Sequence, residues 1–192
     1  MNRMWIAAVT GLLCMLAYGQ EPPAPDCFPL KVGHTWVYEV IGRDEKEAVM
    51  TVFKSEKIGD VECFVLKNWA GTSKDISVAA SAEGIRLHKA HEVCDPPRTL
   101  LKYPLKKGDV WDSGDKMFGV ALKIRNEGEE EIKVPAGTFM CWKIATVAEE
   151  GEKSMTLATQ WFAPGMGLVK MLSGKQLHIE LKSFAKGEES KK

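Results

Sequence analysis

Three side chains that favour transition metals stand three residues apart in the segment HKAHEVC, namely His88, His91 and Cys94. Zinc takes His nitrogen and Cys sulfur as ligands, and three protein ligands with one water molecule form a catalytic zinc site. Residues three apart share one side of a helix, but this stretch reads as the end of a strand that enters a Pro-Pro loop. No fourth ligand stands nearby, so an exposed His88 and a loop Cys94 are the simpler interpretation. A metal-dependent enzyme is the weakest function considered.

Other catalytic patterns find little support in this chain. It holds only four histidines, it lacks the G-x-S-x-G nucleophile motif, and it has no glycine-rich phosphate loop. The run Glu129–Glu131 is more typical of a solvated hairpin arm than of paired acid-base carboxylates. We therefore predict that the protein is not an enzyme and that it carries no cofactor.

Aromatic residues form the second set that could do chemistry, here by binding. The set comprises Trp36, Trp69, Trp111, Trp142, Trp161 and Phe162. Large rings fill the cores of curved sheets, but they also line concave faces that receive apolar ligands. Under the second interpretation, the candidate ligand-binding residues are Trp36, Trp111, Trp161 and Phe162. Because adjacent strand residues point to opposite faces, at most one of Trp161 and Phe162 is expected to point inward.

Side chains of these kinds must be positioned by strands, because a period of two dominates the chain. Leu177, Ile179 and Leu181 alternate with polar residues, as in a strand with one wet face. Turn signals separate such runs at 58–61 and 134–137. No stretch of ten residues combines helical periodicity with a capping signal. The pattern predicts an antiparallel all-β barrel or strongly curved half-barrel with little helix.

Two nearly identical segments indicate how this sheet is built. FPLKVGHTW at 28–36 returns as YPLKKGDVW at 103–111, and Gly-x-x-x-Cys and Gly-aliphatic landmarks follow each copy in the same order. The second pair of landmarks joins Cys63 to Cys141, and the third joins Gly84 to Gly167. We interpret this order as a degenerate tandem duplication, with halves at about 28–90 and 103–172 and a final strand at 175–184. The alternative is that strand-rich chains reuse similar turns.

The N-terminus has the three parts of a secretory signal peptide. Arg3 supplies the positive region, Trp5 to Leu16 the apolar region, and Ala17-Tyr18-Gly19 a small-residue cleavage site. We predict a signal peptide at 1–19, a proline-rich leader at 20–27, a single β domain at 28–184 and a disordered tail at 185–192. Without the signal, no transmembrane anchor is expected, and the protein is exported to the periplasm or the extracellular space.

The charge of the chain limits the partners that it can bind, and its cysteine content limits the disulfides that it can form. The 26 basic and 26 acidic residues are interspersed, which argues against binding to nucleic acid. Cys27, Cys63, Cys94 and Cys141 remain after cleavage of the signal, and an even number in an exported chain permits two disulfides. Cys27 and Cys94 each precede a repeated segment, and Cys63 and Cys141 occupy matching places. Each pair is a disulfide candidate, and buried thiols are the alternative.

Four motifs together resemble one known family: PLKVGHTWVYE, PLKKGDVW, VPAGTFMCWKI and QWFAPGMGLVK. They are similar to those of the domain-of-unknown-function 3108-like family of exported bacterial proteins, across about Phe28 to Met171. The resemblance implies an antiparallel β fold and an address in the cell envelope or outside the cell. It implies no catalytic residues.

Two functions of different classes therefore lead. The first is a non-enzymatic exported β domain that binds an apolar or lipid-like molecule, or a cell-envelope component, on a concave aromatic face. The second is a structural or interaction module whose core is filled and whose edges or loops do the binding. Whether the aromatic residues line an open cavity or a closed core separates the two.

Overall fold

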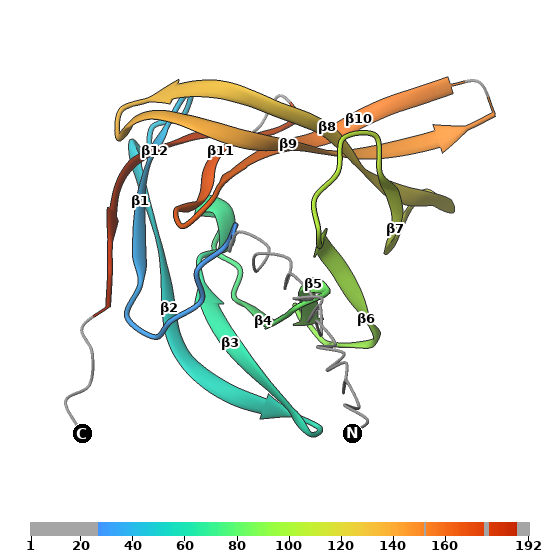
Figure 1. The fold of residues 1–192 in the computed structure, drawn as a ribbon, viewed down its shortest axis with the longest axis horizontal. Helices are drawn as coiled ribbons and strands as arrows, with labels where there is room; N and C mark the ends of the chain where they lie inside the picture. The colour runs from blue at the N-terminus through green and yellow to red at the C-terminus, as the bar shows by residue number, and fades with distance from the viewer. Residues whose placement is uncertain (1–26, 152, 175–176, 188–192) are drawn as a thin grey trace, which may run out of the picture.

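The chain folds into one sheet of twelve antiparallel strands that curls into a nearly closed barrel (Figure 1). The computed structural model describes residues 27–151, 153–174 and 177–187, so the predicted signal peptide lies outside the described residues. The first six strands are β1 (Thr35–Val40), β2 (Glu47–Ile58), β3 (Val61–Lys67), β4 (Ile76–Ser81), β5 (Gly84–Lys89) and β6 (Val93–Lys102). The last six are β7 (Val110–Met117), β8 (Val120–Val134), β9 (Gly137–Glu150), β10 (Lys153–Ala163), β11 (Gly167–Ser173) and β12 (Leu177–Ala185).

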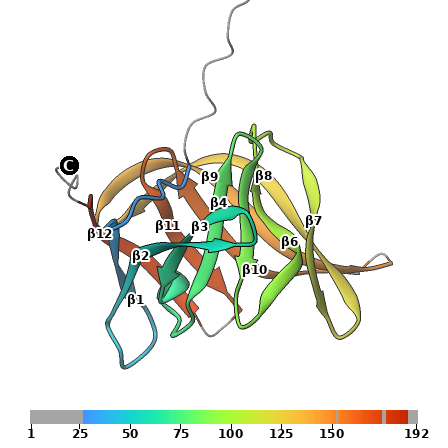
Figure 2. The same ribbon diagram turned by 90° about the horizontal axis from the view of Figure 1, so that it is seen from below.

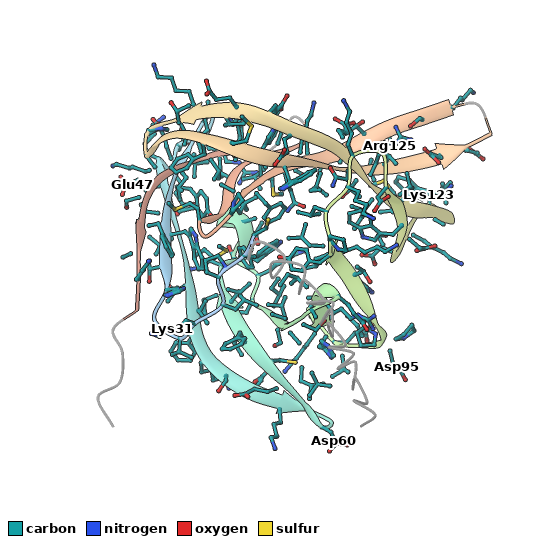
Figure 3. All side chains as sticks on the ribbon, in the orientation of Figure 1. Lys31, Glu47, Asp60, Asp95, Lys123 and Arg125 are labelled. Carbon is teal, nitrogen blue, oxygen red and sulfur yellow. The ribbon has the colours of Figure 1, made fainter. Side chains whose placement is uncertain are left out.

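Alternation along the strands explains why they curl around a core. Trp36, Tyr38 and Val40 of β1 are buried, whereas Glu39 between them is exposed. Charged side chains such as Glu47, Asp60 and Asp95 point away from the barrel (Figure 3). The predicted turn at 58–61 joins β2 to β3, and the turn at 134–137 joins β8 to β9. The predicted all-β class is confirmed, with little helix beyond the 3₁₀ turn η1 (Trp69–Gly71). No described helix is long and apolar enough to span a membrane.

The sheet consists of two six-stranded halves, each a simple meander. Its order is β6-β5-β4-β3-β2-β1-β12-β11-β10-β9-β8-β7, so β1 and β12 join the halves at the centre of the sheet. β6 and β7 are the two edges, and the curl brings these edges side by side (Figure 2).

The repeated sequence motif forms the same turn at the start of each half. In the first copy, the Gly33 amide donates to the Val52 carbonyl (2.8 Å), and the Val52 amide donates to the His34 carbonyl (2.9 Å). In the second copy, the Gly108 amide donates to Asn126 (2.8 Å), and the Asn126 amide donates to Asp109 (2.9 Å). Both glycines have positive φ, +91° and +88°, which L side chains rarely adopt. Each lead-in turn is therefore clamped to the second strand of its half.

The other landmarks also lie on equivalent strands. Cys63 and Cys141 are on β3 and β9, and Gly84 and Gly167 begin β5 and β11. This placement is what a duplication requires, although common ancestry of the halves stays a prediction.

The predicted boundaries need two corrections. The first half extends beyond residue 90, because Val93–Lys102 form β6 despite two prolines. Proline is tolerated on an edge strand, where its missing N–H costs no ladder hydrogen bond. At the other end, Ala185 still belongs to β12, and Gly187 lies so close to Gly33 that a Cβ on either would meet the other. Residues 185–187, which the sequence assigned to the tail, are thus part of the described structure, and the rest of the predicted tail, 188–192, lies outside the described residues.

Candidate ligand-binding site

Trp36 lies at the centre of a packed aromatic cluster. Its ring stacks between those of Phe28 and Phe184, with centroid distances of 5.5 Å and 5.1 Å. Its indole N–H donates to the carbonyl of Met166 at 2.6 Å, and the side chain has no exposed surface. Both faces of the ring are covered, so Trp36 serves the core and offers no surface to a ligand.

Trp161 and Phe162 are also buried, on opposite faces of β10. Phe162 meets the ring of Phe28 edge to face at 6.0 Å, in the core. Trp161 stands directly opposite Lys143 and Lys170, and directly opposite residues share one face of an antiparallel sheet. Its indole N–H donates to a carboxylate oxygen of Glu130. Both rings are thus covered by neighbouring side chains of the described residues, with 6% of Trp161 and 3% of Phe162 exposed.

Trp111 differs from the other three candidates because it is only partly buried. It is the second residue of β7, and its indole N–H donates to the carbonyl of Thr99 on β6 at 3.2 Å. It also borders a hollow of about 390 Å³ together with Arg86 and Lys102. Trp111 therefore lies beside open space, at the line where the two edges of the sheet meet. We call this line between β6 and β7 the seam.

The seam is held by side chains, because β6 and β7 form no backbone ladder in the described residues. Besides the Trp111 hydrogen bond, Arg98 of β6 pairs with Asp115 of β7, with 2.6 Å between Nη1 and Oδ1. Gly114 makes room for this pair, since a Cβ there would stand 3.0 Å from Cγ of Arg98.

Local sequence explains why β6 and β7 do not form a backbone hydrogen-bond ladder. Pro96 and Pro97 remove two backbone donors from β6. On β7, the Gly114 amide donates to Asp112 Oδ1 (2.7 Å) and the Asp115 amide donates to Ser113 Oγ (3.0 Å). In natural sheets, prolines and occupied amides of this kind prevent an edge strand from pairing with another strand. The seam is consequently a weak line in an otherwise continuous barrel.

Behind the seam lies a cavity of about 720 Å³, which we call the seam cavity. This volume falls within the range of sites for small molecules. Its apolar lining residues are Trp69, Ile76, Leu87, Ala90 and Leu100, and its polar ones are Ser73, Lys74, Asp75, His91, Arg98 and Asp115. Trp69 also meets the ring of Phe28 edge to face at 5.7 Å, so one wall of the cavity is anchored to the aromatic cluster.

The charged side chains of the seam cavity differ in whether they already have a hydrogen-bond or ion-pair partner. Asp75 Oδ1 accepts a hydrogen bond from the Asn68 amide at 3.1 Å, which occupies one of its oxygens. Asp115 is paired with Arg98. Lys74 has no ion-pair partner among residues 27–151, 153–174 and 177–187. The seam cavity therefore offers two positive side chains, one of which has its carboxylate partner already in place.

The possible zinc ligands are not gathered. His88 is buried on β5, His91 is exposed in the turn that follows, and Cys94 is buried on β6. Within the described part of the chain, no group of three His, Cys, Asp or Glu residues could hold a metal ion. Burial and the nearby Arg86 lower the pKa of His88. The hairpin does not give the three residues the common face that a helix would give them, because His91 lies in the exposed turn and His88 and Cys94 lie on the two strands beside it.

The proposed disulfides are also not formed. All four cysteines are buried, and no disulfide joins any two of them. Cys63 and Cys141 are separated in the sheet by β2, β1, β12, β11 and β10. Equivalent places in the two halves lie apart in the sheet order, so matching positions in the sequence did not imply contact. Burial raises the pKa of the Cys141 thiol to about 12, and Glu130 contributes in the same direction.

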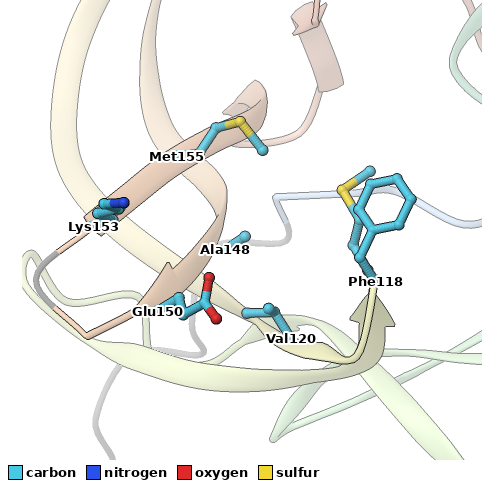
Figure 4. Close-up of a pocket in the computed structure, with 8 residues that line it drawn as sticks. Phe118, Val120, Ala148, Glu150, Lys153 and Met155 are labelled. Atoms are coloured by element: carbon cyan, nitrogen blue, oxygen red, sulfur yellow. The ribbon is translucent and has the colours of Figure 1, made fainter.

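A second concave surface lies between the β7–β8 hairpin and the β9–β10 hairpin (Figure 4). This tip groove is about 290 Å³ and is lined by Met117, Phe118, Val120, Ala148, Glu150, Lys153, Ser154 and Met155. Phe118 is 97% exposed, at a turn with φ of +50°. An aromatic side chain in that position adds nothing to the core.

Sequence reasoning missed most of the seam cavity. Arg98, Asp115 and Trp69 come from three different elements, and no short motif links them. The available signal was the pair Pro96-Pro97, which marks an edge strand and hence the place where the barrel fails to close.

Comparisons with known proteins identify one family and solved structures of similar fold. A family model described as DUF3108-like matches residues 60–173. No curated protein matches the chain. One similar solved structure is that of a predicted exported protein with a YmcC-like fold from Bacteroides fragilis. It is 16% identical, with 83% of this chain and 98% of that chain covered and a TM-score of 0.46. Another is a predicted lipoprotein from Parabacteroides distasonis, 18% identical, with 86% and 100% covered and a TM-score of 0.41.

Proposed function

This chain belongs to the DUF3108-like family, as its motifs predicted, and from that premise we propose that it is an exported, non-enzymatic domain that binds an apolar or amphipathic small molecule. The observation that carries the proposal is the seam cavity, with its apolar walls and its few charged groups near an edge of the sheet. Ligand sites generally combine an apolar body with a small number of polar groups that fix orientation. Export is inferred from the signal-like segment at 1–19.

The binding face differs from the one that the sequence indicated. Trp36, Trp161 and Phe162 are packed in closed clusters, and of the four candidates Trp111 alone stands beside the seam. The concave aromatic face is thus replaced in this proposal by the seam cavity, in which Trp69 is the aromatic wall.

A fluorescent apolar probe tests the proposal. N-phenyl-1-naphthylamine brightens in apolar surroundings, so titration of the exported protein with this probe should give a saturable rise in emission. Replacing Ala90 with tryptophan places a large ring in the seam cavity and should abolish the rise. Ala185→Trp is the matched control, because Ala185 is exposed at the end of β12. The proposal would be wrong if the probe showed no saturable binding to the wild type, or if the two variants bound the probe equally.

The alternative of an interaction module has one observation in its favour, the exposed tip groove around Phe118. If Phe118→Ser lowers recovery of the protein in the cell-envelope fraction while the wild type fails to bind the probe, the interaction module becomes the better account.

A further inference from the structure

Resting on the proposed function, we propose that the ligand is a single-chain amphiphile with an anionic end, and that this anion takes the place of Asp115 on Arg98. The ligand's apolar chain lies along the walls of the seam cavity. Its anionic end, a carboxylate or a phosphate, lies at the seam.

Arg98 lies at the boundary between the apolar and the charged parts of the seam cavity wall. It is directly opposite Leu87 in the β5–β6 pair, so the two side chains share one face of the sheet, and Leu100 lies two residues along at an irregularity of β6. Leu87 and Leu100 both line the seam cavity. A guanidinium presents a planar fork of N–H donors that matches a carboxylate or a phosphate. An amphiphile with its chain against the leucines therefore has its end group within reach of that fork.

Asp115 has the features of a group that an incoming anion can replace. The side chain of Arg98 is 31% exposed and that of Asp115 is 45% exposed. Water can therefore solvate the aspartate once it is released. Ion pairs at such exposure contribute little net stability. Asp115 also lies on the irregular part of β7 just after Gly114, where strand pairing with β8 shifts register.

Lys74 adds a second reason to expect an anion. It lines the seam cavity, and its ammonium has no ion-pair partner in the described ranges, whereas Asp75 beside it already accepts the Asn68 amide. An anionic end group that takes the place of Asp115 on Arg98 can therefore also be attracted by the Lys74 ammonium on the wall of the same cavity.

Binding of this kind also loosens the seam. The Arg98–Asp115 pair and the Trp111–Thr99 hydrogen bond are side-chain links between β6 and β7, and the anion removes the first of them. The same exchange that holds the ligand thus weakens the closure in front of it.

Displacement of N-phenyl-1-naphthylamine by four ten-carbon compounds tests the inference. The compounds are decanoate, decyl phosphate, 1-decanol and decylamine, and each is titrated into wild type, Arg98→Gln and Asp115→Asn. We expect wild type to prefer the two anions. Arg98→Gln should weaken both anions about tenfold or more, as expected for loss of a charge-assisted hydrogen bond. Asp115→Asn should strengthen them about two- to fivefold, because the competing carboxylate is gone. Neither variant should change 1-decanol.

Each other outcome has a distinct meaning. Equal displacement by all four compounds, unchanged in both variants, overturns the anionic end while the proposed function stands. Preference for decylamine overturns it as well. Failure of the probe itself to bind removes the proposed function instead. Decanoate against decyl phosphate separates a fatty-acid source from a phospholipid source. If Arg98→Gln does not fold, Arg98→Lys keeps the charge without the fork and should still weaken the anions more than 1-decanol.

Discussion

Replacing Trp36 with phenylalanine should destabilise the fold by about 2–5 kcal/mol. The smaller ring leaves the carbonyl of Met166 without its 2.6 Å donor, and a buried acceptor without a partner costs about 1–3 kcal/mol. Losing the second ring of a fully buried indole removes apolar contacts with Phe28 and Phe184, which adds about 1–2 kcal/mol. Stacking of the remaining ring should keep the variant folded.

Trp111→Phe is the matched control, because Trp111 holds the same place in the second copy of the motif. Its hydrogen bond to Thr99 is longer, at 3.2 Å, and the side chain is partly exposed at the seam. Water can reach the carbonyl that this change releases, so the expected loss is about 1 kcal/mol or less.

Urea unfolding followed by far-ultraviolet circular dichroism measures both losses. Tryptophan fluorescence is unsuitable, since each variant removes an indole. The two unfolding curves should have equal slopes, so that the midpoints report stability alone. Equal losses for the two variants would refute the assignment of Trp36 to the core and Trp111 to an open seam.

Two further predictions concern the sheet. Gly84→Ala should cost at least about 3 kcal/mol of unfolding free energy in the same assay, because a Cβ there would stand 1.9 Å from the Leu101 carbonyl oxygen. Gly59→Ala, also at positive φ but in open space, should cost only about 1 kcal/mol; similar values for the two would contradict the backbone clash. The raised pKa of Cys141, about 12 against 9.0, means that the folded protein keeps a proton that the unfolded chain loses. Stability should therefore fall as pH rises from about 9 towards 12, and Cys141→Ala should reduce that slope; an unchanged slope would show that the thiol is not the cause.

The fold class was predictable because burial in a curved sheet imposes alternation on the sequence. The motif PLxxGxxW was also informative, since glycine adopts the positive φ of each lead-in turn without the strain that other residues would have there. Strand β6 was missed because Pro96 and Pro97 read as a loop. Propensity alone does not distinguish a loop from an unpaired edge, because in both places the backbone donors are unnecessary.

The candidate site was less predictable for a different reason. A buried tryptophan and a ligand-facing tryptophan have the same sequence signal, and Trp36 and Trp111 even share a motif. What separates them is tertiary: Phe28 and Phe184 cover the first, and a seam adjoins the second. Similarly, the pairing of Arg98 with Asp115 depends on how far the sheet curls, which no local pattern encodes.

The clamped lead-in turn of the second half limits how far the barrel can open. β6 and β7 are consecutive in the chain, and Gly108 and Asp109 are fixed to Asn126 of β8. The Tyr103 amide is still held by the Glu83 carbonyl at 2.9 Å, so residues 104–107 link the two edges, and four residues reach roughly 14 Å when fully extended. A short tether keeps the edges at high effective concentration, so a separated seam finds its partner again quickly. The turn that begins the second half therefore also limits how far β6 and β7 can separate.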